Sequence, residues 1–389
     1  ILASDFLISE SNINTKIKQL SFKDSRGVTL KNLQTDFSYT SSQMVFSDLQ
    51  IETLASIVKG QLQLDYQRKD LKSFSEKVQV SGFFVNSNLD LDEFSLLYDE
   101  FGANQKVEFS TSFSGTLENL LFEDFNLNNS RNTSIIGSLR FSKLFAPSSD
   151  NFELDGKFEK ISSNYEELVA LLPRVLGNTI PSGFKALGRF NLSGQANVTK
   201  ESVKAVMDVN TDIGDFFIDL NLDEIELIDN ASYTGEIRFT DFNLGKAIGE
   251  PMIGLVTSSL RIDGSGFSKE NISSDIKGVI DSFVFRGYDY SKLQLSGVVK
   301  NKVFNGQLDT ADTNLKLNFS GLVDFSGAEN IYDFSALIDY ANLNALQLVA
   351  RDQISILRGE MFVDMKGSSL DDAYGVLSFK DALYENQND

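Results

Sequence analysis

Apolar and polar residues alternate strictly over much of the chain. The clearest runs are 107–117, 152–158, 184–198, 233–239 and 315–319. In the run 184–198, Phe184, Phe190 and Leu192 share one side with small apolar residues, while Lys, Arg, Asn and Gln occupy the other. A period of two is typical of strands with one buried face, and a helix cannot keep it because its period is 3.6. The pattern therefore predicts many β-strands that share one apolar face.

Turn residues interrupt these runs at short intervals, as at 129–132, 229–230, 300–301 and 309–312. Because parallel strands need long crossovers, such short links predict antiparallel pairing. An apolar residue followed by Ser-Gly recurs at Gly82, Gly115, Gly194, Gly297, Gly321 and Gly327. Glycine inside a strand marks a bulge or a bend, so we expect the sheet to coil. The spacing of the repeat varies, which argues against a fixed-period solenoid.

Few helices are predicted. The strongest is Tyr165–Leu176, with Asn164 as its N-cap and an apolar stripe along one side. A second is expected over Glu93–Phe101, and shorter turns at Leu244–Ile248 and Leu343–Leu348. In each place a few polar residues precede a short apolar stripe. We expect these segments to lie over the end of a sheet segment.

The chain contains no His, no Cys and no Trp, which removes most catalytic chemistry. Without His it lacks the usual general base and the commonest metal ligand. Without Cys it has no disulfide framework and no thiolate zinc site. The acidic stretch 219–224 alternates with leucines as a strand does, and it lacks the Gly that a calcium loop needs. We therefore expect no enzyme activity, no metal site and no cofactor.

Charge and length narrow the class further. The 389 residues carry 55 Asp plus Glu against 35 Lys plus Arg, a net charge of −20, which disfavours nucleic acid as a partner. Hydrophobic residues make up 41% of the chain, with 32 Phe, so it is too apolar for a disordered acidic segment. No apolar run reaches the 18 residues of a spanning helix. We expect one β region over 1–389, with 1–160 and 161–389 as sub-segments, cut from a longer chain.

An ordered series of motifs resembles a known family. The series is Tyr233-Thr-Gly235-Glu-Ile-Arg-Phe239, then Gly278-Val-Ile-Asp-Ser-Phe-Val-Phe-Arg-Gly287, Phe304-Asn-Gly306, Asn314-Leu-Lys-Leu-Asn-Phe-Ser-Gly321, and a segment from Phe334 to Leu346. Their order is similar to that in the TamB branch of the AsmA-like proteins, in the Bacteroidota form. The likeness covers the second half of the chain well and the first half more loosely.

This resemblance implies a fold, a function and a location. The fold would be an elongated, curled antiparallel β-sheet, a taco-like trough with a hydrophobic interior and a few short helices. The function would be a periplasmic bridge that carries phospholipid between the inner and outer membranes, assembles outer-membrane proteins, or does both. The implied partners are phospholipid acyl chains and an Omp85-family, TamA-like outer-membrane protein. The chain would be anchored in the inner membrane of a Gram-negative bacterium by a segment outside this sequence, with membrane contact at the chain ends.

The residues supply a physical reason for such a role. An acyl chain costs about 0.8 kcal/mol per methylene to expose to water, and an apolar trough would shelter it. Ionisable residues are scarce on the predicted apolar face, so lipid should slide along it instead of binding at one tight site. The predicted lining residues are Phe109, Phe113, Phe184, Phe190, Leu192, Ile237, Phe239, Phe283, Phe285, Leu315, Leu317 and Phe319.

Two other functions remain open from the sequence. An outer-membrane β-barrel also alternates in short strands, but its girdles favour Trp and Tyr. This chain has no Trp, and it has 32 Phe against 11 Tyr. A structural or adhesive β-solenoid would show a fixed repeat length. An ordinary β-sandwich core would explain the alternation equally well.

Overall fold

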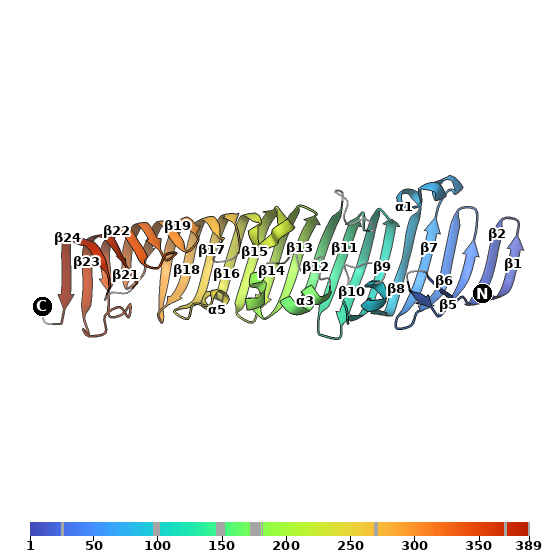
Figure 1. The fold of residues 1–389 in the computed structure, drawn as a ribbon, viewed down its shortest axis with the longest axis horizontal. Helices are drawn as coiled ribbons and strands as arrows, with labels where there is room; N and C mark the ends of the chain where they lie inside the picture. The colour runs from blue at the N-terminus through green and yellow to red at the C-terminus, as the bar shows by residue number, and fades with distance from the viewer. Residues whose placement is uncertain are drawn as a thin grey trace. The chain divides into compact units, whose positions relative to one another are not determined.

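Most of the chain forms β-strands in the computed structural model (Figure 1). The structure describes residues 1–24, 27–95, 102–144, 152–171, 180, 182–267, 271–368 and 372–387. Strands account for 68% of the residues and helices for 10%, which confirms the all-β class. Pairing is antiparallel and involves 22 strands, so the predicted antiparallel sheet is confirmed as well.

The chain divides into two compact units. The first comprises Ile1–Ile180 with Arg189–Met207, and the second Pro181–Gly188 with Asp208–Asp389. The chain passes from the first unit to the second for the last time within β14 (Ser202–Thr211).

In the first unit, strands that follow one another along the chain pair side by side. They are β1 (Leu2–Ser9), β2 (Asn12–Gln19), β5 (Asn32–Tyr39), β6 (Gln43–Glu52), β7 (Ile57–Asp65), β8 (Gln79–Asp90), β9 (Lys106–Thr116), β10 (Asn119–Asn129), β11 (Ser134–Ser142), β12 (Glu153–Asn164) and β13 (Arg189–Thr199). A separate hairpin joins β3 (Phe22–Lys23) to β4 (Thr29–Leu30).

The second unit repeats this plan. Its strands are β15 (Gly214–Asp223), β16 (Ser232–Asn243), β17 (Ile253–Ser265), β18 (Ser273–Phe285), β19 (Tyr288–Lys300), β20 (Val303–Ala311), β21 (Leu315–Asp324), β22 (Asn330–Asn342), β23 (Ser355–Gly367) and β24 (Tyr374–Asn386). Among the described strands, β24 pairs with β23 alone, and β1 pairs with β2 alone.

Helices are short and lie between strands. They are η1 (Arg68–Ser73), α1 (Phe74–Lys77), α2 (Leu91–Ser95), α3 (Tyr165–Leu171), η2 (Ser182–Leu187), η3 (Ile225–Asn230) and α5 (Leu244–Ile248). The predicted turn at Leu244–Ile248 is confirmed as α5, and a non-helical turn occupies Leu343–Leu348.

The two longer predicted helices are confirmed in part. The backbone N–H of Glu167 donates to the Asn164 side chain at 2.8 Å, so Asn164 caps α3 as predicted. The prediction beyond Leu171 lies outside the described residues. The helix predicted to begin at Glu93 begins two residues earlier, at Leu91, and its continuation past Ser95 also lies outside them.

Two predicted boundaries are wrong. The run from Phe184 was expected to be strand throughout, but residues 182–187 form η2 and β13 begins at Arg189. Between them Gly188 has a φ of +68°, a left-handed conformation that ends the alternation. The break expected at Asp309–Asp312 also comes later, because β20 runs to Ala311.

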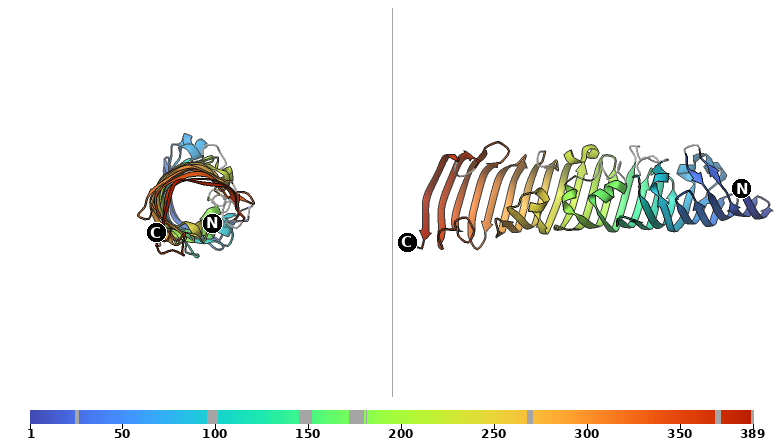
Figure 2. Two further views of the ribbon diagram at one scale, coloured as in Figure 1. Left: turned by 90° about the vertical axis from the view of Figure 1, so that its left-hand side faces the viewer. Right: turned by 60° about the horizontal axis from the view of Figure 1, so that its bottom comes forward.

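β-Bulges bend the sheet of each unit at regular places. In the first unit the ladders slip beside Asp48, Asn86 and Asp124, whose φ values are 47°, 46° and 49°. In the second they slip beside Asp241 and Asp381. Asn and Asp tolerate left-handed φ better than other side chains, and a bulge increases local twist and bends its strand. Figure 2 shows the resulting curvature of the strands, so the predicted curl is present within each unit.

Candidate functional site

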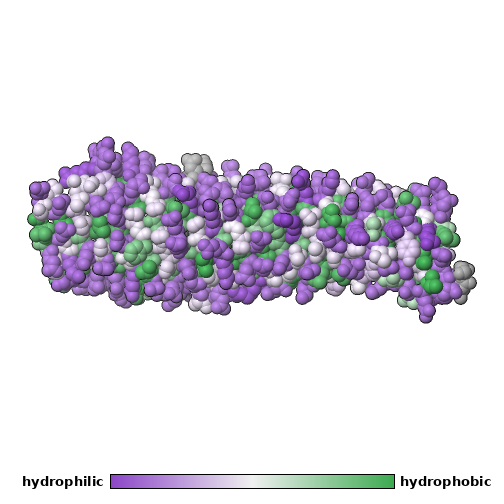
Figure 3. Space-filling view, turned by 180° about the vertical axis from the view of Figure 1, so that it is seen from behind, coloured by the Kyte–Doolittle hydropathy of each residue, from purple (hydrophilic) through white to green (hydrophobic). Residues whose placement is uncertain are grey.

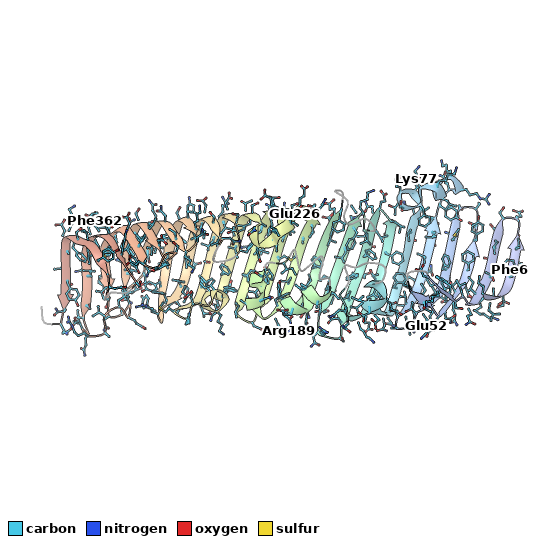
Figure 4. All side chains as sticks on the ribbon, viewed as in Figure 1. Phe6, Glu52, Lys77, Arg189, Glu226 and Phe362 are labelled. Carbon is cyan, nitrogen blue, oxygen red and sulfur yellow. The ribbon has the colours of Figure 1, made fainter. Side chains whose placement is uncertain are left out.

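One face of each sheet carries apolar residues that are buried or partly exposed, while the residues between them are mostly exposed. We call the first the inner face and the second the outer face. Phe362 on β23 belongs to the outer face, since it lies between Met361 and Val363; it is 41% exposed and labelled in Figure 4. Hydrophilic residues cover most of the surface in Figure 3, with hydrophobic residues in patches among them.

Directly paired residues form two continuous apolar rows across the inner face of the first unit. From β5 to β13 the first row is Phe37, Phe46, Leu62, Gly82, Phe113, Phe122, Leu139, Gly156 and Ala196. The second is Tyr39, Met44, Leu64, Val80, Gly115, Leu120, Phe141, Leu154 and Val198. Neither row contains an ionisable carboxylate or amine.

The second unit has an equivalent pair of rows across ten strands. From β15 to β24 the first row is Ile218, Ile237, Leu260, Gly278, Leu295, Leu308, Phe319, Ala336, Met361 and Phe379. The second is Leu220, Gly235, Ile262, Ile276, Gly297, Gly306, Gly321, Phe334, Val363 and Leu377. Strands lie about 4.8 Å apart, so these rows span roughly 43 Å without a polar side chain. We call the paired rows of each unit its central rows.

Aromatic rings in these rows contact one another across strands. Ring centroids lie 5.0 Å apart for Phe37 and Phe46, and 5.0 Å apart for Phe319 and Phe334. Phe304, one row further along, covers two glycines: a Cβ atom added to Gly297 or Gly306 would lie 2.8 or 2.9 Å from its ring. The recurrent strand glycines therefore make room for phenylalanine rings on the inner face.

Beyond the central rows, the inner face is covered at one end by the protein's own helices and turns. In the first unit Leu91 of α2 and Leu171 of α3 form a buried cluster with Val107 on β9. In the second, Leu346 of the 343–348 turn is 1% exposed and packs with Ile338 and Ala341. These segments lie over the end of a sheet segment, as the sequence predicts.

Buried threonines separate these two parts of the inner face. The hydroxyls of Thr35 and Thr111 donate to the carbonyl oxygens of Ser47 and Glu123 at 2.7 and 2.9 Å. In the second unit Thr310 donates to the carbonyl of Ser291 at 3.0 Å. Each accepting carbonyl precedes a residue with left-handed φ, so these hydroxyls satisfy backbone groups that the irregular ladder leaves open.

The twelve predicted lining residues fall into three groups. Phe113, Ile237 and Phe319 lie in central rows. Those nearer the helices and turns are Phe109, Phe190, Leu192, Phe239, Phe283, Phe285, Leu315 and Leu317. Phe184 lies on η2, outside the strands. The structure thus gathers most of them on one face, but only three of them in the central rows.

Other central-row residues were missed by sequence reasoning, although a signal for them exists. Leu260, Leu295 and Leu308 sit in alternating strands like the predicted residues do, but only hairpin register places them beside Ile237 and Phe319. Register depends on bulges, which alternation by itself does not locate.

A polar cluster around Asp312 is internally satisfied. The carboxylate of Asp312, 3% exposed, accepts from the Tyr288 hydroxyl at 2.6 Å and from the Ser291 hydroxyl at 2.7 Å. Burial alone would raise the pKa of Asp312, but these hydrogen bonds and those from backbone N–H groups outweigh it, so its pKa lies below the usual value. These hydrogen bonds tie the start of β19 to the residue that follows β20.

Glu93 on α2 acts in the same way. Its carboxylate accepts from the Thr53 hydroxyl, from the Ser56 hydroxyl at 2.6 Å and from the backbone N–H of Ala55 at 3.1 Å. Burial opposes ionisation, yet the pKa of Glu93 is lowered overall by these donors. Glu93 therefore ties α2 to the turn between β6 and β7.

Within the described ranges, no group of three or more acidic residues is arranged to hold a metal ion. No helix in the same ranges is long and apolar enough to cross a membrane.

Comparison with known proteins gives no relative. No protein-family model, no curated protein and no solved structure matches this chain.

Proposed function

We propose that the inner face binds the acyl chains of phospholipids and that the protein is a non-enzymatic lipid conduit. One observation carries the proposal: in each unit, two neighbouring rows of directly paired residues cross every strand from β5 to β13 or from β15 to β24 with no charged side chain. The only other sheet in the described part of the chain is the small hairpin β3–β4. A long apolar face of this kind needs an apolar partner.

The energetics favour lipid as that partner. Each methylene transferred from water to an apolar surface contributes about 0.8 kcal/mol. Since the chemical character of the central rows hardly changes from strand to strand, neighbouring positions should bind an acyl chain with similar affinity. Because the affinities are similar, an acyl chain can move along the rows without being held at one tight binding position.

The setting of this function follows from the motif resemblance. We propose that the chain belongs to the TamB branch of the AsmA-like proteins and acts in the periplasm, between inner and outer membranes. An Omp85-family protein would be its outer-membrane partner, for phospholipid transfer, outer-membrane protein assembly or both. Fractionation of a tagged chain from a Gram-negative host tests the location, and co-purification of an Omp85-family protein tests the partner.

Lipid binding can be tested on the purified chain. The protein, isolated without detergent, should carry phospholipid that is detectable by mass spectrometry after solvent extraction. A double variant Phe113→Asp with Ile237→Asp places a carboxylate in the central rows of each unit and should lose most of this lipid. The matched control, Ser114→Asp with Thr234→Asp, places the same charges on exposed outer positions beside them. Lipid-free wild-type protein, or equal lipid in both variants, would contradict the proposal.

A further inference from the structure

In the second unit, the short helix η2 connects the two ends of the strand β15. At one end, where η3 follows the strand, the carboxylate of Asp229 accepts hydrogen bonds from the backbone N–H and the hydroxyl of Ser182, each at 3.1 Å. At the other end, the backbone N–H of Asp212, just before β15, donates to the carbonyl oxygen of Leu187 at 3.2 Å. Ser182 and Leu187 are the first and last residues of η2. The helix therefore reaches both ends of one strand.

The dimensions of these elements show that η2 crosses the open side of a curled strand. β15 has 10 residues, which extend about 30 Å along the path of the strand. η2 and η3 have 6 residues each and rise about 2.0 Å per residue, so together they span roughly 24 Å. Because this span is shorter than the strand, the two helices can join its ends only on the concave side.

Burial identifies the covered side of β15 as the inner face. Phe216, Leu220 and Leu222 on that face are 9%, 8% and 9% exposed. Asp219 and Asn221, on the outer face between and beside them, are exposed. η2 therefore lies over the inner face. We call residues 182–188 the strap.

The two attachments of the strap differ in strength. Leu187 is 6% exposed and η2 lies beside α5, so this end is held by buried apolar surface as well as by the hydrogen bond from Asp212. Ser182 is exposed and is attached through its hydrogen bonds to Asp229. Water competes for hydrogen bonds at exposed sites, so their net contribution to stability is small. The attachment at Ser182 is therefore the weaker one.

The residues around the strap allow it to open at the Ser182 end. The carbonyl oxygen of Asp229 accepts from the backbone N–H of Phe267 at 2.9 Å and from the Asn271 side chain at 2.7 Å, so η3 is held to the loop between β17 and β18. At the other end of the strap Gly188 has a φ of +68°, which glycine adopts at little cost. The strap can thus turn about Gly188 while η3 stays in place.

A phospholipid that moves along the inner face would meet the strap. Its acyl chains lie against apolar side chains, but its charged head group stays in water, because burying a charge without a partner is costly. The head group must therefore project from the open side of the sheet, which the strap crosses at β15. The lipid cannot pass β15 while both attachments hold.

We infer that the strap is a gate in the lipid path of the second unit, and that it opens when Ser182 separates from Asp229. This inference rests on the proposed function and adds a point of control to it. Phe319 on β21 lies six strand spacings, or about 29 Å, from β15. Lipid binding at Phe319 should therefore not depend on the gate.

The absence of Cys from the chain allows the gate to be locked selectively. In the full-length double variant Ser182→Cys with Asp229→Cys, copper phenanthroline oxidises the two thiols to a disulfide and dithiothreitol reduces it, and mass spectrometry verifies each state. Transfer of a fluorescent phosphatidylethanolamine from donor to acceptor vesicles is then measured. We expect the oxidised protein to transfer lipid about tenfold more slowly, equivalent to about 1.4 kcal/mol in the barrier, and reduction to restore the rate.

A photo-crosslinker at Phe319 separates the gate from lipid binding. With p-benzoylphenylalanine at this position of the double variant, the lipid adduct after irradiation should be equal in the oxidised and reduced states. Equal transfer in both states, with adduct at 319, would overturn the gate and leave the proposed function intact. An adduct that falls on oxidation as far as transfer does would also overturn the gate, because the lock would then disturb the whole unit. Neither adduct nor transfer in either state would overturn the proposed function itself.

A single substitution tests the gate in the opposite direction. Asp229→Ala removes the acceptor of Ser182 and should speed transfer about threefold, the factor expected from one net hydrogen-bond contribution. Glu226→Ala makes the same change at an exposed position of η3, labelled in Figure 4, and should leave the rate unchanged. Circular dichroism checks that both variants fold. An unchanged or slower rate in folded Asp229→Ala would contradict the gate.

Discussion

The Thr111 hydroxyl on β9 donates a hydrogen bond of 2.9 Å to the carbonyl oxygen of Glu123 on the neighbouring strand β10. Thr111 is 4% exposed and lies on the inner face between Phe109 and Phe113. The acceptor directly precedes Asp124, whose φ is 49° and beside which the ladder slips. A polar side chain inside the apolar face therefore stabilises the bulge that bends the sheet.

We expect Thr111→Val to destabilise the first unit by about 1–3 kcal/mol, because the substitution keeps the shape of the side chain and leaves the Glu123 carbonyl without its donor. Urea unfolding followed by circular dichroism would show a lower midpoint. Thr111→Ser keeps the hydroxyl and should lower the stability of the unit much less. Ser114→Ala, at an exposed position of the same strand, should leave the midpoint unchanged; if it falls as far as in Thr111→Val, the hydrogen bond is not the cause.

Alternation predicted those parts of the fold that depend on local pattern. The alternating run 107–117 differs from the observed strand β9, Lys106–Thr116, by one residue at each end. Leu244–Ile248 is helical over the predicted range. In β9 the period of two is enough to predict the strand. In the helix at Leu244–Ile248, the Asn243 side chain caps the first turn by accepting a hydrogen bond from the N–H of Lys246 at 2.9 Å. Neither feature depends on residues distant in the sequence.

The predictions that failed are those that depend on interactions between residues distant in the sequence. Asp309–Asp312 contains turn-forming residues, yet Thr310 stays in β20 because its hydroxyl bonds to Ser291, 19 positions earlier. Positions of the central rows depend on pairing register, and register depends on bulges at residues such as Asp48 that look like ordinary polar positions. Among the predicted lining residues, Phe113 and Phe319 lie in the central rows and most others lie nearer the helices and turns, a division that alternation alone does not resolve.

Asp312 should make the second unit sensitive to acid. Its pKa in the folded protein lies below the unfolded value of about 3.9, so its contribution to stability is complete above that value and is lost as pH falls through the folded pKa. Asp312→Asn should cost about 1.5–3 kcal/mol at pH 7, since a charged acceptor of the Tyr288 and Ser291 hydroxyls is lost.

The difference in stability between wild type and Asp312→Asn should narrow below about pH 4, because the unfolded chain then takes up a proton on Asp312 while the folded protein, with its lower pKa, still holds the charge. Urea midpoints at pH 7, 5 and 3 measure it. The matched control is Asp309→Asn, on β20 three residues before Asp312, which should show a smaller loss. A gap that stays constant from pH 7 to pH 3 would show that the Asp312 charge does not contribute.

The substitution Ser258→Ala should make the folded protein more stable. Its hydroxyl oxygen is buried, with 3% of the residue exposed, and has no hydrogen-bond partner among the described residues. An unsatisfied buried hydroxyl costs about 1–3 kcal/mol, so we expect Ser258→Ala to raise the urea midpoint by an amount equivalent to about 1 kcal/mol. Ser274 on β18, equally buried, donates to the carbonyl of Asp263 at 3.4 Å, and Ser274→Ala should not raise the midpoint. A lower midpoint in Ser258→Ala would mean that its hydroxyl does have a partner.

Gly321 should tolerate no side chain. Its φ is +148°, and a Cβ atom there would lie 2.4 Å from the carbonyl oxygen of Asp333 on β22. Such a backbone conformation is essentially restricted to glycine and costs other residues about 1–3 kcal/mol, before the added clash with Asp333 is counted. Gly321→Ala should therefore lower the thermal midpoint of the second unit. Ser320→Ala, on the exposed outer face of the same strand, should change stability by less than about 0.5 kcal/mol. Because the clash would be with Asp333 on β22, hydrogen-exchange changes in Gly321→Ala should centre on the β21–β22 ladder; changes confined to β15–β17 would contradict the steric explanation.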